Sequence, residues 1–520
     1  MFRLITLSFV TIILFSCNNQ PDYFKNQSHA NVPDESITKG QALAVQYCQS
    51  CHALPDPSLL SSQIWQKGVL PAMGPRLGIF EYQFQRYINS LGDPNVSNYY
   101  PSQPVISLEQ WQNIIDYYTS LSPDALPLQS RKQKIDTNLA LFTAAIPAIK
   151  YQDPATCFIA ADTFKHSIYV SDIIKQSIYS YNSKLHLQDS IKTGGCIVQL
   201  IQPQNTGITL CNIGVFTPNN AKAGSIQNLT FKNEKFQLQK KAVYNQLLRP
   251  VHISEADIDI DGRKDYVVCE FGYLIGAFSW LQNKGDSTYV RHVIRNVPGA
   301  IKSVITDFNK DGKPDIVALF AQGDEGIFLF INKGNGIFDT KEVLRFPPSN
   351  GSSYFELDDF NHDGYPDILY TCGDNADYSQ ILKPYHGVYI YLNDKHNNFK
   401  QTFFFPVNGC YKAMARDFDN DGDLDIATIA YFADFAHQPD EGFIYLENKG
   451  NLTFQPYSLP ATRQGRWINM DVADIDGDHR PDILLANCSV GPTINYAAYN
   501  WKKGPPFMVL KNTGQENERE

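Results

Sequence analysis

Two cysteines and a histidine near the N-terminus form the first cluster that could do chemistry. Residues 48–52 read Cys48-Gln-Ser-Cys51-His52, the spacing of c-type haem attachment. Thiols three positions apart share one helical turn, so both can add to the vinyl groups of one haem, and the adjacent imidazole can bind its iron. The alternative is a disulfide beside an unrelated histidine. The pattern favours covalently bound haem c, with His52 as proximal ligand.

The opposite iron ligand follows by elimination. Between residues 53 and 125 there is no further histidine and one methionine, Met73, within Leu70-Pro-Ala-Met-Gly-Pro75. A thioether opposite histidine raises the reduction potential relative to two histidines. Met73 is therefore the predicted sixth ligand. The alternatives are a core methionine, an open position or ligation by Lys67.

Acidic loops form the second chemical pattern, Asp-x-Asp/Asn-x-Asp-Gly-x-x-Asp, which recurs with steps of 50, 52, 58 and 57 residues. The fifth copy has His479 in place of the glycine. The candidate ligands are Asp257, Asp259, Asp261, Asp265; Asp307, Asn309, Asp311, Asp315; Asp359, Asn361, Asp363, Asp367; Asp417, Asp419, Asp421, Asp425; and Asp474, Asp476, Asp478, Asp482.

Oxygen ligands at positions 1, 3, 5, 7 and 9 of such a loop can surround one hard cation, and glycine at position 6 permits the tight turn. Helical calcium sensors continue to a glutamate at position 12, whereas β sequence follows here, as in Ile426-Ala-Thr428. We expect about five Ca²⁺ ions on strand-loop-strand units. Their expected role is bracing the turn, with regulation as the alternative.

The elements around the cysteines resemble a known family. Gly40, Tyr47 and the 48–52 motif are similar to the first helix of class I cytochromes c, with Thr38 as its expected N-cap. A closing helix is predicted over 108–121, begun by a Ser107–Gln110 capping box and stopped by Pro123. The resemblance implies a small all-α cytochrome c domain.

The acidic repeats resemble FG-GAP or VCBS repeats of integrin-like β-propellers over about residues 150–520. Each loop should join the first two strands of a blade, and the third strand should be an apolar run ending in asparagine, such as Phe443–Asn448. Two ion-free blades precede these five, so the resemblance implies an all-β, seven-bladed propeller. Residues 137–147 should supply the last strand of blade seven and close the ring.

The N-terminus indicates export. Met1-Phe-Arg3 precedes an apolar run that ends in Leu14-Phe-Ser-Cys17, as in a signal peptide. The ending resembles a bacterial lipobox, which implies lipidation at Cys17, with plain secretion as the alternative. The expected organisation is a lipoprotein signal peptide (1–16), a tether (17–35), the cytochrome c domain (36–122), a linker (123–136) and the propeller (137–520).

Composition sets limits on partners. The chain has 520 residues, 43% of them apolar and 19% charged, with a net charge of −10. It can build a large core, and its negative charge argues against sequence-independent binding of nucleic acid. The expected partners are a redox protein or small-molecule donor, and a membrane through the anchor. The expected location is the outer membrane, on the periplasmic or cell-surface side.

Polar residues at one register of the first strands should meet at the propeller mouth. These funnel candidates are His252, Lys302, Tyr354, Lys412 and Asn469, with Arg249 and Arg466 three residues further upstream in two blades. A solvated rim is the alternative to a binding or catalytic pocket. Blade geometry also predicts two disulfides, Cys372–Cys410 and Cys157–Cys488, with buried free thiols as the alternative.

Three functions fit these features. The first is a lipid-anchored electron carrier whose propeller is a docking or recognition scaffold. The second is a dehydrogenase that oxidises a substrate at the propeller mouth and passes electrons to the haem. The third is a carbohydrate-binding or adhesion module. The first assumes least, because it needs only a haem that changes oxidation state.

Overall fold

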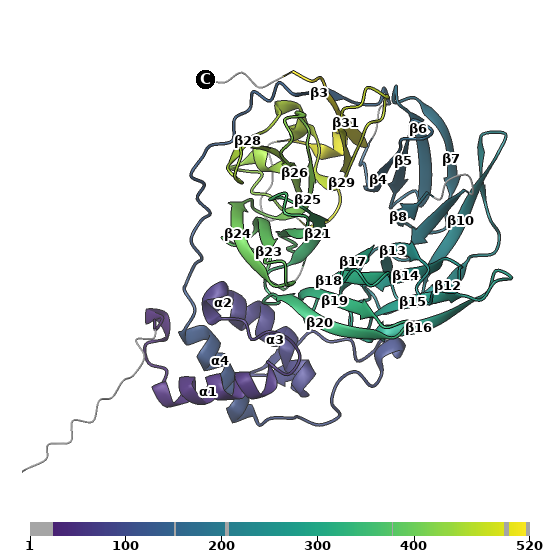
Figure 1. Ribbon diagram of the computed structural model, residues 1–520. Helices are drawn as coiled ribbons and strands as arrows, with labels where there is room; N and C mark the ends of the chain where they lie inside the picture. Colours follow the sequence, from purple (N-terminus) through teal and green to yellow (C-terminus); the bar gives the residue numbers. More distant parts are fainter. Residues whose placement is uncertain (1–23, 150–151, 203–206, 377, 493–498, 516–520) are drawn as a thin grey trace, which may run out of the picture.

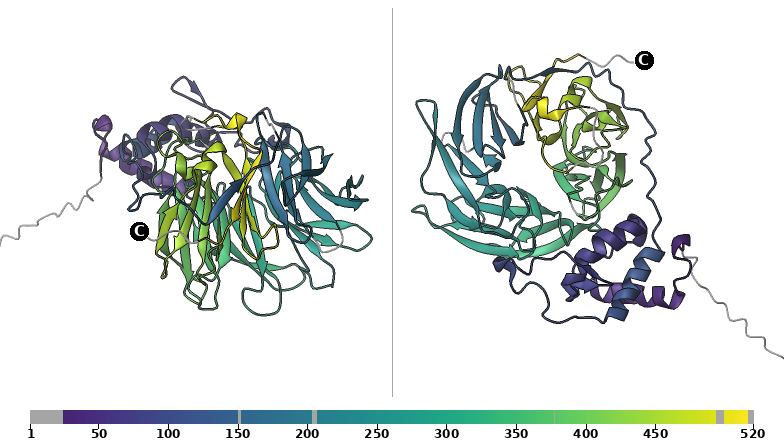
Figure 2. Two further views of the ribbon diagram at one scale, coloured as in Figure 1. Left: turned by 90° about the horizontal axis from the view of Figure 1, so that it is seen from above. Right: turned by 180° about the vertical axis from the view of Figure 1, so that it is seen from behind.

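The computed structural model describes residues 24–149, 152–202, 207–376, 378–492 and 499–515. The predicted signal peptide and Cys17 lie outside these ranges. A group of helices, residues 24–122, lies beside a ring of β-sheets (Figures 1 and 2). No helix of the described residues is long and apolar enough to cross a membrane.

Two long helices pack against each other in the N-terminal part, α1 (Asp34–Tyr47) and α4 (Leu108–Ser120). The predicted capping box of α4 is confirmed, since Ser107 accepts from the Gln110 amide and Gln110 accepts from the Ser107 amide. The predicted N-cap of α1 is wrong. The helix begins five residues earlier, with Pro33 at the N-cap position, and the Thr38 hydroxyl donates to the Asp34 carbonyl oxygen inside the helix.

Short helical turns connect the two long helices, and Trp65–Val69 is a π-helical turn. Met73, the predicted sixth ligand, is the last residue of α3. The short elements are η1 (Gln27–His29), η2 (Pro57–Leu59), α2 (Ser62–Ile64), η3 (Trp65–Val69), α3 (Leu70–Met73), η4 (Gly74–Leu77), β1 (Glu81–Tyr82), β2 (Gln85–Arg86) and η5 (Pro94–Val96). Further 3₁₀ turns lie in propeller loops: η6 (Pro439–Gly442), η7 (Pro460–Gln464) and η8 (Trp501–Lys503).

Seven antiparallel sheets form the ring, which confirms the predicted seven-bladed propeller. The two blades without acidic loops come first. They are β4 (Thr156–Asp162), β5 (Ser167–Asp172), β6 (Ser177–Asn182) and β7 (Leu187–Lys192), then β8 (Ile197–Ile201), β9 (Ile208–Asn212), β10 (Gly224–Lys232), β11 (Lys235–Leu238) and β12 (Tyr244–Leu247).

The five blades with acidic loops follow in chain order. They are β13 (Pro250–Ala256), β14 (Asp265–Glu270), β15 (Ala277–Asn283) and β16 (Tyr289–Arg295); β17 (Ala300–Thr306), β18 (Asp315–Phe320), β19 (Gly326–Asn332) and β20 (Phe338–Arg345); β21 (Ser352–Asp358), β22 (Asp367–Cys372), β23 (Gly387–Asn393) and β24 (Phe399–Pro406); β25 (Cys410–Arg416), β26 (Asp425–Ala430), β27 (Phe443–Asn448) and β28 (Phe454–Tyr457); and β29 (Trp467–Ala473), β30 (Asp482–Asn487) and β31 (Phe507–Asn512).

The last blade takes its outer strand from the chain ahead of blade one. Phe142–Ala145 form β3, which pairs antiparallel with β31. Phe142 itself is buried against Phe418 and Tyr445 of blade six. Both ends of the ring therefore meet within one sheet, so the seam is hydrogen-bonded and has no open edge.

Buried apolar side chains fill the spaces between neighbouring blades. The second strands are buried along their whole length, as in β18 and β26, and pack against the adjoining sheets on both faces. This explains why these strands are continuous apolar runs without alternation. The rigid sheets hold the loops at either end of the ring in fixed positions.

Candidate functional sites

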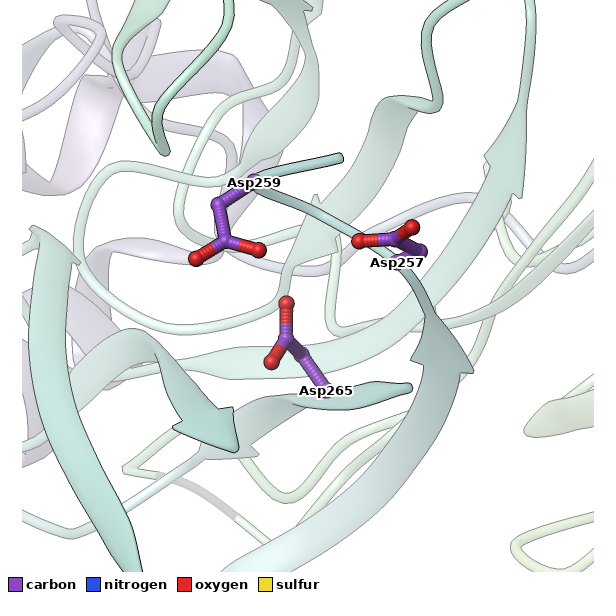
Figure 3. A group of neighbouring side chains, drawn as sticks. All are labelled: Asp257, Asp259 and Asp265. Atoms are coloured by element: carbon purple, nitrogen blue, oxygen red, sulfur yellow. The ribbon is translucent and has the colours of Figure 1, made fainter. Parts of the chain in front are cut away.

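Each acidic loop joins the first strand of its blade to the second. In three loops the carboxylates at positions 1, 3 and 9 lie with oxygen atoms within 4.8 Å of one another. In the loop between β13 and β14 these are Asp257, Asp259 and Asp265, whose carboxylates point toward a common centre (Figure 3). The other groups are Asp417, Asp419, Asp425 and Asp474, Asp476, Asp482. These groups could bind calcium.

Backbone amides shape each loop around its first and last aspartates. Asp257 accepts from the amides of Asp261 and Gly262 at 2.9 and 2.8 Å. Asp265 accepts from Ile258 at 3.0 Å and from Asn283, the last residue of β15, at 2.7 Å. The corresponding hydrogen bond, from the asparagine that ends the third strand to the aspartate at position 9, recurs in all five blades. Position 9 therefore ties the loop to strand three, whatever else it binds.

The aspartate at position 5 is bonded to the residue at position 7, which is not the arrangement expected for an ion ligand. Asp261 accepts from the Arg263 amide and pairs with its guanidinium. Asp311 likewise accepts from the Lys313 amide and lies 2.8 Å from its ammonium. The structure thus gathers positions 1, 3 and 9 and turns position 5 toward position 7.

Two loops have asparagine at position 3, and these side chains accept backbone amides within the loop. The Asn309 side-chain oxygen accepts from the Asp311 amide at 2.9 Å, and that of Asn361 from the Asp363 amide at 3.1 Å. In the fifth loop His479 occupies position 6 with φ 67°, where the other copies have glycine at φ 82° to 97°. The backbone path is thus conserved without glycine.

Burial disfavours the charged form of several of these carboxylates. It raises the pKa of Asp425 to about 7 and that of Asp482 to about 6. Burial, followed by the charge of Asp421, raises the pKa of Asp419 to about 6. A divalent cation would reverse this cost, because it interacts favourably with the ionised oxygens.

Four funnel candidates come together on the inner strands of the ring. The ammonium nitrogens of Lys302 and Lys412 lie 3.7 and 4.6 Å from the centre of the Tyr354 ring. Lys412 also donates to the Met470 carbonyl oxygen at 2.6 Å. Lys412 and Asn469 line a cavity of about 310 Å³ bounded by β4, β8, β25 and β29. Because these strands belong to different blades, the cavity lies in the central channel.

Two acidic residues whose charges act on these lysines, Glu356 and Asp471, were not predicted from the sequence. Glu356 accepts from the Tyr354 hydroxyl at 3.1 Å and from Arg416 at 3.3 Å. Asp471 lines the same cavity and accepts from the Ala161 amide at 2.9 Å. Both acids lie two residues after a candidate on the same strand. Alternate residues share one face of a strand, so this register could have revealed them.

The channel charges also affect one another. Burial lowers the pKa of Lys302 to about 7. Burial, followed by the charge of Glu356, raises the pKa of Asp358 to about 7. The side-chain oxygens Asp358 Oδ2 and Asn469 Oδ1 are buried and have no hydrogen-bond partner among the described residues. The channel thus holds polar groups with unused capacity for a ligand.

The remaining upstream candidates do not form part of this cluster. Arg466 is fully buried, and its guanidinium donates to the carbonyl oxygens of Tyr431 and Gly491 at 2.9 and 3.2 Å. It stacks 3.7 Å from the centre of the Tyr431 ring. Arg249 is buried as well and donates to the Phe216 carbonyl oxygen. His252, by contrast, is close enough to the channel cluster to be affected by its charges: burial, followed by the charges of Lys302 and Lys412, lowers the pKa of His252 to about 3.

Cys48, Cys51 and His52 directly follow α1. Both thiols are free of disulfides. The His52 Nδ1 atom is hydrogen-bonded to the Ala53 carbonyl oxygen at 2.8 Å, a bond that leaves Nε2 as the atom able to bind a metal. Burial lowers the pKa of His52. Met73 packs against the same hydrophobic core as Cys48. These residues could hold a haem.

The propeller contacts the helical part directly. The Tyr385 hydroxyl donates to the Leu59 carbonyl oxygen at 3.2 Å, and Asn220 donates to Asp93 at 2.9 Å. Ile381, in a loop of blade five, packs against the core of the helices. Through the charges of Asp324 and Arg345, blade four also affects the pKa of His52.

The two predicted disulfides are not present, since every described cysteine is a free thiol. Cys488 lies near the Tyr431 hydroxyl, at 3.7 Å, and Cys410 near the Thr428 hydroxyl, at 3.3 Å. The predicted pairing of Cys157 with Cys488 is replaced by a close approach of Cys157 to Cys196. The predicted partner is the wrong neighbour, because β4 and β8 begin side by side and bring Cys157 to Cys196.

Sequence comparison supports FG-GAP-like repeats in the propeller. Residues 307–370, which include the second and third acidic loops, match the FG-GAP-like repeat family. An alignment 107 positions long, which covers 18% of this chain and 10% of integrin alpha-PS5 of Drosophila melanogaster, shows 36% identity. The N-terminal domain of Nup159 has a TM-score of 0.42 at 10% identity, with 74% of this chain and 99% of that chain covered. An ancestral GH74 enzyme has a TM-score of 0.43 at 10% identity, with coverage of 70% and 47%. The chain is a seven-bladed β-propeller containing FG-GAP-like repeats, preceded by helices.

Proposed function

We propose that this protein is an exported c-type haem protein that carries electrons, and that its propeller, braced by calcium, is the scaffold that recognises a partner. The observation that carries the proposal is the placement of Cys48, Cys51 and His52 at the end of α1, with the His52 Nδ1 atom on the Ala53 carbonyl. A recognition or scaffold role for the propeller accords with its FG-GAP-like repeats.

In this proposal Cys48 and Cys51 would attach the haem, and His52 and Met73 would be the ligands of its iron. The bound haem supplies one-electron chemistry. The Ala53 carbonyl keeps the imidazole in one tautomer and orientation, which favours a stable ligand field. Met73 is half-buried against the helical core, and that apolar surrounding would exclude water from the iron.

The crossing of the two long helices gives further support. Tyr117 of α4 lies against Gly40 of α1, so the helix backbones approach closely at this point. The class I cytochrome resemblance rests on this first helix. The close crossing would anchor the helix that ends at Cys48 against the rest of the domain.

Export and anchoring complete the proposal. The integrin-like FG-GAP repeats suggest an extracellular or exported protein. Lipidation of Cys17 would tether the protein to the outer membrane, on its periplasmic or surface side. A redox protein or small-molecule donor would then exchange electrons with the haem.

The experiment is to produce the full chain in a host that exports and attaches haem c, and to measure the covalent haem spectrum and potential. Met73→Ala should keep the haem attached and lower its potential. Lys67→Ala is the matched control and should leave the potential unchanged. The proposal fails if His52→Ala has no effect on the spectrum, or if no haem is attached to Cys48 and Cys51.

The channel favours a second candidate, a dehydrogenase that oxidises a small polar substrate there. The supporting observation is the 310 Å³ cavity, where Lys412 and Asp471 lie beside the unpaired Asn469 oxygen. Lys412→Met and Asp471→Asn should then abolish substrate-dependent haem reduction without loss of haem. If reduction by every donor proceeds at the parent rate, the channel has no catalytic role.

A further inference from the structure

Two buried cysteines of neighbouring blades lie in contact. Cys157 is the second residue of β4 in blade one, and Cys196 directly precedes β8 in blade two. Their sulfur atoms are 2.7 Å apart. The exposed fractions of the two residues are 7% and 2%.

The backbone fixes this approach from both sides. The pairing register of β4 with β5 shifts between Thr156 and Phe158. Cys157 lies at this irregularity, where its side chain need not follow the alternation of side chains between the two faces of the strand. The chain at Cys196 is held by the Ile213 amide, which donates to the Cys196 carbonyl oxygen at 3.0 Å. The Ile197 amide donates to the Ser171 hydroxyl of blade one at 3.2 Å.

We propose that Cys157 and Cys196 form a disulfide that joins the first two blades. Two sulfur atoms at 2.7 Å are closer than unbonded thiols pack, and a shift of well under 1 Å reaches the disulfide bond length of about 2.05 Å. The inference rests on the exported location within the proposed function, because an oxidising compartment is where such a bond persists.

The reaction balances with a disulfide oxidant. The two thiols lose two protons and two electrons as the Cys157–Cys196 bond forms, and one R–S–S–R molecule is reduced to two R–SH. Burial raises the pKa of the Cys157 thiol, which suppresses the reactive thiolate in the folded protein. The bond therefore forms during folding, before the blades close over the pair.

The position of the pair gives the disulfide a structural role. Blades one and two lack the acidic loops that recur in the other five blades. The bond would join two residues 39 positions apart in the sequence, one in each of these two blades. It would restrain the part of the ring that has no ion to brace its turns.

Other buried cysteines are the alternative disulfide partners that the experiment must distinguish. Cys488 is the nearest rival, because its main chain bridges to Ala155 beside Cys157, but its thiol lies near the Tyr431 hydroxyl and the Val490 carbonyl oxygen. Cys372 lies near the Tyr385 carbonyl oxygen at 3.4 Å.

The test counts thiols in the exported, haem-loaded protein. Of nine described cysteines, haem attachment occupies Cys48 and Cys51, so seven remain. The protein is denatured without reductant and alkylated with N-ethylmaleimide. Five labels are expected before reduction and seven after it, and a peptide map should link Cys157 to Cys196. Disulfide reduction in denaturant and refolding under reducing conditions should lower the Tm by about 5 °C.

Two variants sharpen the result. Cys196→Ser frees Cys157, so six labels are expected without reductant, whereas the control Cys211→Ser should give four. Seven labels on the parent after refolding with oxidised glutathione, or a link between Cys157 and Cys488, would overturn the inference. Haem content is read from the separate peptide carrying Cys48 and Cys51, so failure of haem attachment is distinguished from failure of the disulfide.

Discussion

Gly40 on α1 lies against the main chain of Asn113 on α4, where a β-carbon on Gly40 would be 1.8 Å from the Asn113 carbonyl oxygen. The crossing therefore depends on the missing side chain, because backbone cannot move aside as a flexible side chain can. The helix that carries the cysteine motif is positioned by this contact.

Gly40→Ala should force the two helices apart and destabilise the helical part by about 3 kcal/mol. Hydrogen exchange of the α1 and α4 amides measures the effect, and covalent haem content gives a second readout. Gly92→Ala is the matched control, since a β-carbon there meets nothing within 4 Å. Equal exchange in the two variants would contradict the close crossing.

Calcium should stabilise the propeller, because its ions relieve repulsion among buried carboxylates. Chelation should lower the Tm of the parent protein, and added calcium should restore it. Asp419→Asn tests one loop without disturbing its shape, because Asn309 and Asn361 occupy the same position in two other loops. In chelator, the free energy of unfolding of the variant should be about 1 kcal/mol higher than that of the parent, after allowance for solvent screening. Calcium should stabilise the variant less than it stabilises the parent.

Differential scanning calorimetry with and without calcium checks this prediction. The control is Asp339→Asn, an exposed aspartate that lies outside the loops and pairs with Lys333. It should change neither the calcium-free stability nor the gain from calcium. If calcium stabilises the Asp419→Asn protein as much as it stabilises the parent, this loop binds no ion.

The segment between the helices and the propeller is bonded to blade six. Arg131 pairs with Glu441, which is fully buried, and Arg131 itself is only 8% exposed. Burial raises the pKa of Glu441 to about 7, and Arg131 opposes that rise. A carboxyl group with a raised folded pKa favours folding at low pH, and this contribution is lost as pH rises through that pKa.

Arg131→Met should thus destabilise the protein by about 3–5 kcal/mol at pH 8, where an unpaired carboxylate would be buried. The loss should be smaller at pH 5, where Glu441 is protonated. Urea unfolding at both pH values measures the difference. Arg86→Met, which removes a surface partner of Glu81, should change stability by less than about 0.5 kcal/mol at either pH. A pH-independent loss would contradict the role of Glu441.

The repeats made the propeller predictable, because each acidic loop and each strand-ending asparagine is a local pattern. The Asn448 amide, for example, donates to Asp425 of the preceding acidic loop, so the two local patterns belong to one blade. The lysine and tyrosine positions in the channel also followed from register. The burial of Arg466 could not be predicted in this way. Its partners are carbonyl oxygens of two other loops, which no local sequence pattern specifies.

The pairing of the cysteines could not be predicted from local sequence patterns either. Cys157 has potential partners in two neighbouring blades, and a shift of one residue in β4 decides which one its side chain meets. The start of α1 was missed for a simpler reason. Thr38 is a favourable N-cap residue, but Pro33 followed by Asp34 and Glu35 is an equally good start, and the longer helix buries Ile37.

The fourth position of every acidic loop has a positive φ, and in the first loop this position is Ile260, with φ 63°. A branched side chain in the left-handed region clashes with its own backbone at a cost of about 1–2 kcal/mol. Ile260 is 54% exposed, so it recovers little by burial. In the fourth loop the same position is Asn420, with φ 61°, a residue type that tolerates this conformation.

Ile260→Asn should therefore stabilise the protein by about 1 kcal/mol, measured by urea unfolding. The gain should appear both with calcium and in chelator, because the strain belongs to the backbone of the loop and not to its ion. Ile260→Gly should gain less, since glycine also increases the entropy of the unfolded chain. The control Ile337→Asn replaces an isoleucine that is 63% exposed and is not among the residues with positive φ, so it should bring no gain. If both asparagine variants change stability equally, the gain comes from replacing an exposed apolar side chain by a polar one, and the loop is unstrained.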